Sequence, residues 1–252
     1  MQDNLCAKID TVGDASQFLQ YIASAGIWSI NPYRHCQHRC IYCIARSQGE
    51  STPWHAPGAV IPVLRSALQQ IPYDAEIFIG SLVDAYPPLE RGLGITRLIL
   101  RELVYQQRPF CINTKSDLVT RDIDLLDEHN GHCDVCLSLC SLDDDALWVL
   151  EPGAPSSLER LDAIRVLHQS DIEVIIDASP WIPGISNARE LIAQRPDNVP
   201  VHFAPLDLRC LGGQITLLGR KYTQEEIDTA YCAERDALGE IDGVLWKETV
   251  LV

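Results

Sequence analysis

The segment that decides the fold is residues 26–43, which read GIWSINPYRHCQHRCIYC. Its first half is an apolar run, Gly26–Tyr33, of the kind that forms a buried strand. Its second half is a polar loop with three cysteines in C-x3-C-x2-C spacing, namely Cys36, Cys40 and Cys43. The sequence therefore predicts a strand that leads directly into a loop with three thiols.

Apolar runs and helical patterns alternate downstream of this first strand. Five further strands are predicted at Glu76–Gly80, Pro109–Ser116, Cys133–Ser141, Glu173–Ser179 and Val201–Leu208. Helices are predicted at Val60–Gln70, Ile95–Tyr105, Ser157–His168 and Gln224–Leu238, with Ser156 or Ser157 as a cap. Six strands that alternate with helices imply a parallel sheet, which right-handed crossovers curl into a barrel or wind open. A final apolar run, Gly243–Val252, resembles another strand.

The chain has 252 residues, of which 46% are hydrophobic and 22% are charged, a balance typical of a globular protein. No linker or repeat divides it, so we predict one domain over 1–252 with a core at about 26–210. Residues 1–25 and 211–252 are then N-terminal and C-terminal extensions. The sequence shows neither a signal peptide pattern nor a long apolar run, which predicts a cytoplasmic protein with no membrane partner.

The chain is strongly acidic, with 20 Lys and Arg against 35 Asp and Glu and a net charge of −15. Such a surface repels phosphate backbones, whereas proteins that bind nucleic acids usually carry a basic patch. Nucleic acid is therefore disfavoured as a partner, although a local basic groove stays open.

The cysteine loop has the chemistry of a metal centre. In a reducing compartment, cysteines are more often metal ligands or buried thiols than disulfides. Three neighbouring thiolates can bind three irons of one [4Fe–4S] cubane and leave the fourth iron open to another ligand. A zinc site, with His35 or His38 as the fourth ligand, and free thiols are the alternatives.

The spacing of these cysteines is weak support by itself, because the chain also contains the reverse spacing. Cys133, Cys136 and Cys140 form that second set, inside a predicted strand. Strand alternation places Cys136 and Cys140 on one face and Cys133 on the other, so the three thiols of this set do not converge.

Further segments, taken in order, match a known family. They are Asn31–Arg46, Gly80–Pro88, Thr114–Ser116, Arg121–Leu126, Glu151–Pro155 with Arg160 and Leu161, and Pro183–Gly184. Together they resemble the spore photoproduct lyase-like branch of the radical S-adenosylmethionine (SAM) proteins. The resemblance covers roughly residues 26–210.

This resemblance implies a partial (β/α)6 barrel of the TIM type, with parallel strands inside and helices outside. It implies two cofactors, a [4Fe–4S] cluster on Cys36, Cys40 and Cys43, and SAM. Reductive cleavage of SAM would give a 5′-deoxyadenosyl radical that abstracts hydrogen from a small-molecule or peptide substrate. An electron donor such as flavodoxin or ferredoxin would then be a partner.

The resemblance also implies which residues contact SAM. Gly80, Ser81 and Asp84 correspond to the segment that meets the methionyl amino group, and Lys115 and Ser138 correspond to further contacts. Tyr42, beside the third cysteine, places backbone near the adenine. Alternation agrees, because it sets Cys111, Asn113 and Lys115 on one strand face, and Cys136, Ser138 and Cys140 on the corresponding face of another.

This sequence departs from the lyase at one important position. The lyase uses a cysteine hydrogen donor near the end of its second strand, where this chain reads Phe78-Ile-Gly-Ser-Leu82. DNA repair is therefore disfavoured, and Cys140 and Cys111 are candidate hydrogen donors in place of the missing cysteine. A base-modifying radical SAM enzyme and a non-catalytic iron–sulfur or zinc protein stay open as alternatives. Candidate substrate contacts in the barrel interior are Asp84, Tyr86, Asp177, Trp181, His202 and Asp207.

Overall fold

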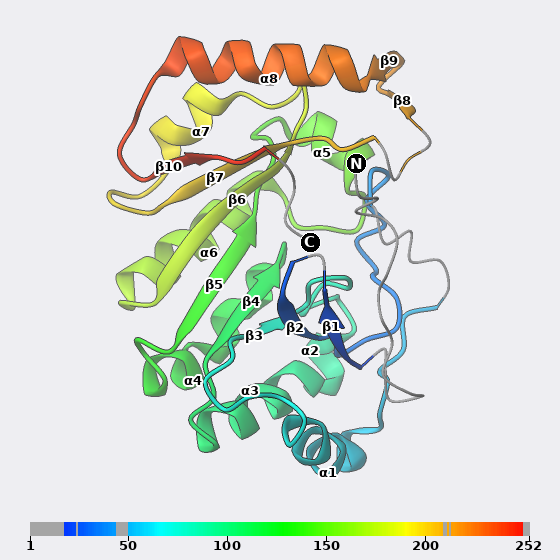
Figure 1. Cartoon of the computed structure of the whole chain (residues 1–252), viewed down its shortest axis with the longest axis vertical. Helices are drawn as coiled ribbons and strands as arrows, with labels where there is room; N and C mark the ends of the chain where they lie inside the picture. Colours follow the sequence, from blue (N-terminus) through cyan, green and yellow to red (C-terminus); the bar gives the residue numbers. More distant parts are fainter. Residues whose placement is uncertain (1–17, 24, 44–49, 209–210, 212, 249–252) are drawn as a thin grey trace.

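The computed structural model describes residues 18–23, 25–43, 50–208, 211 and 213–248 (Figure 1). Most of the predicted extension 1–25 and the end of the apolar run 243–252 lie outside these residues. So do Ala45 and Arg46 of the cysteine segment. In the part of the chain that is described, no helix is long and apolar enough to cross a membrane.

The body of the protein is an eight-stranded sheet. Its strands are β1 (Leu19–Ile22), β2 (Ile27–Ile30), β3 (Ile77–Ile79), β4 (Phe110–Thr114), β5 (Cys133–Ser138), β6 (Glu173–Trp181), β7 (Val201–Pro205) and β10 (Val244–Trp246). Strands β2 to β7 lie side by side in chain order and pair in parallel, and β10 adds to β7 in parallel. This order confirms the predicted partial barrel of parallel strands.

Strand β1 pairs with β2 in the antiparallel direction and was not predicted. Its four residues, LQYI, are too few to show a strand period, so only the pairing reveals it. The final apolar run was predicted correctly in part, because its first residues form β10.

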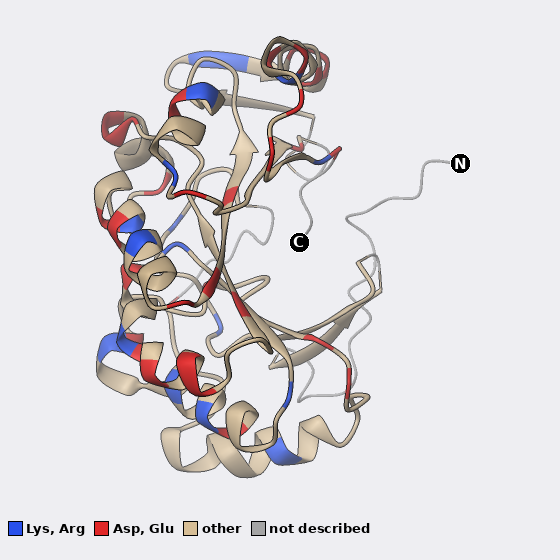
Figure 2. Cartoon of the chain, turned by 90° about the vertical axis from the view of Figure 1, so that its left-hand side faces the viewer, with Lys and Arg blue, Asp and Glu red and all other residues tan. Residues whose placement is uncertain are grey.

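Helices gather on one side of the sheet (Figure 2). They are α1 (Pro57–Leu68), α2 (Glu90–Leu93), α3 (Ile95–Tyr105), α4 (Ile123–Glu128), α5 (Asp144–Leu150), α6 (Ser157–Gln169), α7 (Ala188–Gln194) and α8 (Gln224–Leu238), with a 3₁₀ turn at Asp117–Asp122. Helices α3 and α8 have the predicted bounds, whereas α1 starts three residues early because Pro57 occupies its first turn. Ser156 caps α6 in a capping box with Glu159, as one of the two predicted caps.

The two faces of the sheet differ in polarity. On β5, Cys133, Val135 and Leu137 are buried under the helices, while Asp134, Cys136 and Ser138 are half-buried on the other face. The register continues this second face across the sheet to Cys111, Asn113, Asp177 and His202. Parallel strands with both faces packed are apolar throughout. We call this polar face, away from the helices, the inner face.

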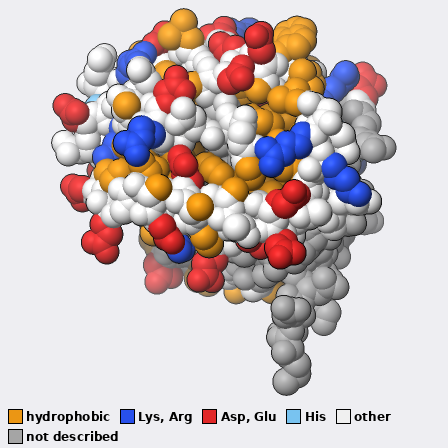
Figure 3. Space-filling view, turned by 90° about the horizontal axis from the view of Figure 1, so that it is seen from above, with side chains coloured by type: hydrophobic (Ala, Val, Ile, Leu, Met, Phe, Trp, Pro, Cys, Tyr) orange, Lys and Arg blue, Asp and Glu red, His pale blue; other side chains and the backbone are white. Residues whose placement is uncertain are grey.

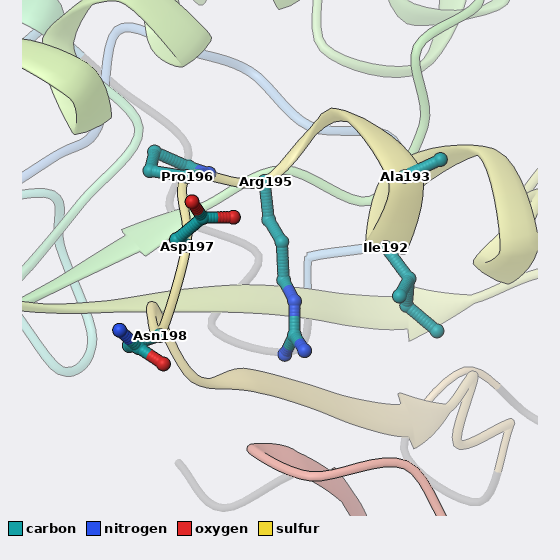
Figure 4. A pocket seen from close by; sticks show the side chains of 6 residues that line it. All are labelled: Ile192, Ala193, Arg195, Pro196, Asp197 and Asn198. Atoms are coloured by element: carbon teal, nitrogen blue, oxygen red, sulfur yellow. The ribbon is translucent and has the colours of Figure 1, made fainter.

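A surface pocket of about 490 Å³ lies at the turn between α7 and β7 (Figure 4). It is lined by Ile192, Ala193, Arg195, Pro196, Asp197 and Asn198. The Arg195 guanidinium donates to the carbonyls of Val199 (3.3 Å) and Asp242 (2.8 Å), which fastens the loop before β10. This pocket lies at the amino end of β7 and belongs to the packing of that edge.

Candidate cofactor and active site

The predicted site residues gather at the carboxyl ends of the parallel strands. The cysteine loop follows β2, Gly80 to Asp84 follow β3, Lys115 follows β4, and Cys140 follows β5. In barrels of parallel strands, this edge carries the active site. The fold thus brings together segments that are more than 100 residues apart in the chain, such as Tyr42 and Glu151.

The three thiols of the cysteine loop are partly buried and influence one another. Burial, with repulsion from Asp84 and Cys43, raises the pKa of Cys36 to about 12. Burial also raises the pKa of Cys40, as do Glu151, Cys36 and Cys43, while Lys115 lowers it. Thiolates in such surroundings are stabilised by a bound cation.

The cysteine loop suits an iron–sulfur cluster better than a single metal ion. Within the described ranges, no three His, Cys, Asp or Glu side chains converge so as to hold a single metal ion. A cubane makes a different demand, because each thiolate binds its own iron. Cys36, Cys40 and Cys43 are half-buried free thiols on one loop at the strand ends, and three thiolates are the donor set that such a cluster takes.

Asp84 ties the cysteine loop to the ends of β3 and β4. Its carboxylate accepts hydrogen bonds from Thr114 Oγ1 (2.7 Å), Lys115 N (2.7 Å) and Tyr86 N (2.8 Å), and His38 Nε2 lies 3.4 Å away. Burial alone would raise the pKa of Asp84, but His38 and the hydrogen bonds lower it to about 2. Both oxygens have protein partners, and direct contact of Asp84 with SAM stays a prediction.

The segment after β3 has the features of a ligand cradle. Gly80 has φ +92°, and a Cβ there would lie 2.6 Å from the Asn113 carbonyl oxygen and 2.7 Å from Ala85 N, so glycine is required. The Ser81 hydroxyl is buried without a hydrogen-bond partner in the described part of the chain. A buried hydroxyl without a partner is costly, so a polar ligand group fits there.

Sequence reasoning missed that Asn31 shapes this cradle. Its side-chain oxygen accepts hydrogen bonds from the backbone N–H groups of Leu82 (3.1 Å) and Val83 (3.2 Å). Asn31 directly follows β2, so one amide joins the beginning of the cysteine loop to the loop after β3. The signal was a polar side chain at a strand end, which by itself does not name its partner.

Glu151 is the centre of a buried charge cluster that the sequence did not reveal. Its carboxylate accepts a hydrogen bond from the Tyr42 hydroxyl and lies 3.1 Å from Lys115 Nζ and 2.5 Å from Arg160 Nη2. The Cys140 thiol donates to it over 3.6 Å. We call these five residues the Glu151 hub. Three residues predicted for separate roles, Tyr42, Lys115 and Cys140, therefore share one carboxylate.

Gly153 presses the turn after Glu151 against the cysteine loop. Its N–H donates to the His38 carbonyl (3.0 Å), and a Cβ at this position would lie 2.1 Å from the carbonyl oxygen of Gln37. No atom pair tolerates that separation, so the backbone of the cysteine loop would have to move.

Gly153→Ala is therefore expected to lower the iron and sulfide retained after anaerobic reconstitution, by about tenfold when iron is limiting. The matched control is Gly92→Ala in α2, where a Cβ meets no atom within 4 Å. Equal iron content in the two variants would show that the cysteine loop does not depend on this contact.

The two candidate hydrogen donors lie in different places. Cys140 is 1% exposed and lies at the strand ends beside Tyr42, 3.9 Å from its hydroxyl. Cys111 is on the inner face near the start of β4, in register with Phe78 and Asp134. It is four residues before Lys115, or about 13 Å along the strand. Cys140 is therefore the thiol next to the cysteine loop.

The inner face carries further polar groups near the strand ends. Ser138 is in register with Asp177, which is in register with His202. Burial raises the pKa of Asp177, and burial with the Lys247 ammonium lowers the pKa of His202 to about 4. The Asp177 carboxyl group lies on the neighbouring strand in register with His202, and the Lys247 ammonium acts on both groups.

The prediction that Tyr86 and Trp181 face the barrel interior was wrong, because both lie in the main hydrophobic core. The Tyr86 hydroxyl donates to Asp122 (3.1 Å), and its ring is fully buried in the main core. Trp181 packs against Tyr231 with ring centroids 5.6 Å apart. Both residues follow or end a strand, where the alternation of faces no longer holds.

Seen from the end that carries α8, one face of the molecule shows acidic side chains scattered among basic and hydrophobic ones (Figure 3). This agrees with the net charge of −15. The view gives no continuous basic strip of the kind that tracks a phosphate backbone.

Known proteins with similar sequences point to the same family as the cysteine loop does. The radical SAM superfamily model matches residues 30–194. An uncharacterized protein of Methanocaldococcus jannaschii is 30% identical over 231 residues, which cover 88% of this chain and 87% of that protein.

Two solved structures share the fold at low identity. A mutant of spore photoproduct lyase with bound AdoMet and dinucleoside spore photoproduct has a TM-score of 0.65 at 15% identity, covering 99% of this chain and 81% of the lyase. Streptococcus suis SuiB bound to S-adenosylmethionine has a TM-score of 0.60 at 12% identity, covering 91% of this chain and 54% of SuiB. With its matched cysteine loop, strand order and relatives, the chain belongs to the radical SAM superfamily.

Proposed function

We propose that this protein is an enzyme in which Cys36, Cys40 and Cys43 hold a [4Fe–4S] cluster and which acts on a small-molecule or peptide substrate. One observation carries the proposal. The three thiols, the Ser81 hydroxyl, which has no hydrogen-bond partner in the described residues, and the Lys115 ammonium all lie at the same end of the parallel strands. When bound, the cluster and SAM supply a 5′-deoxyadenosyl radical that abstracts hydrogen from the substrate.

In this proposal, different residues bind different parts of SAM. Ser81 and the backbone at Gly80 receive the methionyl amino group, and the Lys115 ammonium meets the carboxylate or a ribose oxygen. Tyr42 lines the adenine side, with its hydroxyl fixed by Glu151. Ser138 lies on the inner face, where its hydroxyl is available to SAM or substrate.

The substrate binds against the inner face in this proposal. Asp177, neutral His202 and Lys247 offer an acceptor, an imidazole and a cation within one polar surface. This mixture favours a polar small molecule or a peptide. Cys140, beside the cysteine loop, is the favoured hydrogen donor. The structurally similar SuiB is known in complex with its precursor peptide SuiA, which makes a peptide worth testing first.

The proposal is tested by incubating anaerobically reconstituted protein with SAM and a chemical reductant, or with reduced flavodoxin or ferredoxin, and measuring 5′-deoxyadenosine. We expect the wild type to form it and Cys40→Ala to fall to background, because one thiolate of the cluster is lost. Cys232→Ala, at an exposed cysteine in α8, is the control and keeps wild-type activity. Bound zinc without labile sulfide, or an intact cluster that yields no 5′-deoxyadenosine, would overturn the proposal.

A further inference from the structure

A second hydrophobic cluster lies apart from the main core, at the strand ends. Its buried members are Tyr42, Leu150, Ile182, Leu206, Leu208, Leu217, Tyr222 and Ile227. Cys40, Ile185, Leu211 and Ile215 pack against it. Two residues of the cysteine loop and several residues of the C-terminal segment therefore share one apolar contact region.

The C-terminal side of this region is the hairpin of β8 (Gln214–Leu217) and β9 (Arg220–Thr223). The hairpin is anchored by the Tyr222 hydroxyl, which donates to the Pro183 carbonyl (3.1 Å) beyond the end of β6. Gln224, at the start of α8, accepts from Leu208 N (2.7 Å) and donates to the Leu206 carbonyl (3.1 Å). These bonds hold the hairpin against the ends of β6 and β7.

The cysteine loop meets the same region from the other side. Ile41 N donates to the Leu150 carbonyl (2.9 Å), and Tyr42 is almost fully buried. The hairpin lies beyond residue 194, where the match to the superfamily ends. Figure 1 shows it in orange at the same end of the molecule as the blue cysteine loop.

We infer that the β8–β9 hairpin is a roof over the Cys40 side of the cluster, with Leu217 and Tyr222 as positioning residues that exclude water. The inference rests on the proposed function, because it assumes that the three cysteines hold the cluster. Solvent access and the apolar surroundings of a cluster set its potential and its resistance to attack. The superfamily segment supplies the thiols in this reading, and the C-terminal extension supplies their dry environment.

The test compares three leucine variants of the reconstituted full chain. Leu217→Thr introduces a hydroxyl into the roof at a fully buried position. Its neighbour Leu218 is 49% exposed with φ +49°, a left-handed conformation that asparagine tolerates, so Leu218→Asn is the matched polar control. Leu126→Thr changes a fully buried leucine of the main core and controls for loss of stability. The readouts are the rate at which the visible absorbance of the cluster decays in air or with a chelator, and the melting temperature of cluster-free protein.

We expect the cluster of Leu217→Thr to decay about tenfold faster than that of the wild type. Leu218→Asn and Leu126→Thr keep the wild-type rate, although Leu126→Thr melts at a lower temperature. If the cluster of Leu217→Thr decays at the wild-type rate, or if that of Leu126→Thr decays equally fast, the inference that the hairpin shields the cluster is wrong. A wild type that takes up no iron and sulfide would instead overturn the proposed function beneath it.

Discussion

Glu151→Gln is expected to lower the free energy of unfolding by about 3–5 kcal/mol, because it removes the only carboxylate of the Glu151 hub. Arg160 is fully buried, and its guanidinium lies 2.5 Å from that carboxylate. The amide keeps the shape of the side chain but leaves the fully buried Arg160 guanidinium without its ion-pair partner and removes one carboxylate beside Lys115. Unfolding in urea at fixed pH, with the slope of the transition unchanged, measures the difference.

The control for this variant is an ion pair on the surface. Asp162 and Arg165 lie 2.8 Å apart on α6 and are both exposed, so Asp162→Asn should change the unfolding free energy by less than about 0.5 kcal/mol. The double variant Glu151→Gln with Arg160→Met should recover part of the loss, since it removes the stranded guanidinium. A loss for Glu151→Gln as small as for Asp162→Asn would mean that the hub does not hold charged groups.

Lys115→Met is expected to weaken binding of S-adenosylhomocysteine by about 10- to 100-fold, the value of one charge-assisted hydrogen bond. The ammonium is 14% exposed at the strand ends, and Glu151 holds it there. S-adenosylhomocysteine carries the amino acid part of SAM, whereas 5′-methylthioadenosine lacks it. Calorimetry should therefore show that the second ligand binds the variant almost as well as the wild type.

Lys221→Met, at an exposed lysine of β9, is the matched control and should bind both ligands like the wild type. An equal loss for both ligands in Lys115→Met would place the lysine near the adenosine part instead. Unchanged binding of S-adenosylhomocysteine would remove Lys115 from the proposed cofactor site altogether.

Local patterns predicted the scaffold because they depend on neighbours in the chain. Helices α3 and α8 have the predicted bounds, and strand alternation correctly separated Cys133 from Cys136. Strand β1 escaped prediction because its stability comes from pairing with β2.

The charged parts of the site could not be predicted in the same way. Glu151 and Asn31 are polar residues at the ends of elements, and their partners are fixed only by tertiary packing. For the same reason Tyr86 and Trp181 were wrongly assigned to the interior, since each lies where the alternation of a strand stops. Strand interiors follow the sequence pattern, whereas strand ends depend on what the fold brings beside them.

The contact between Tyr42 and Glu151 spans 109 positions of the chain. A nascent chain that has emerged only as far as β5 contains all three cysteines and Asp84, which ties their loop to β3 and β4, but it lacks Glu151 and Gly153, which also contact the loop. Domains fold as units once their contacts are available. The contacts of the cysteine loop with Glu151 and Gly153 therefore form only after these later residues have left the ribosome. Under the proposed function, we expect the chain to complete this contact before a cluster is installed on the three cysteines.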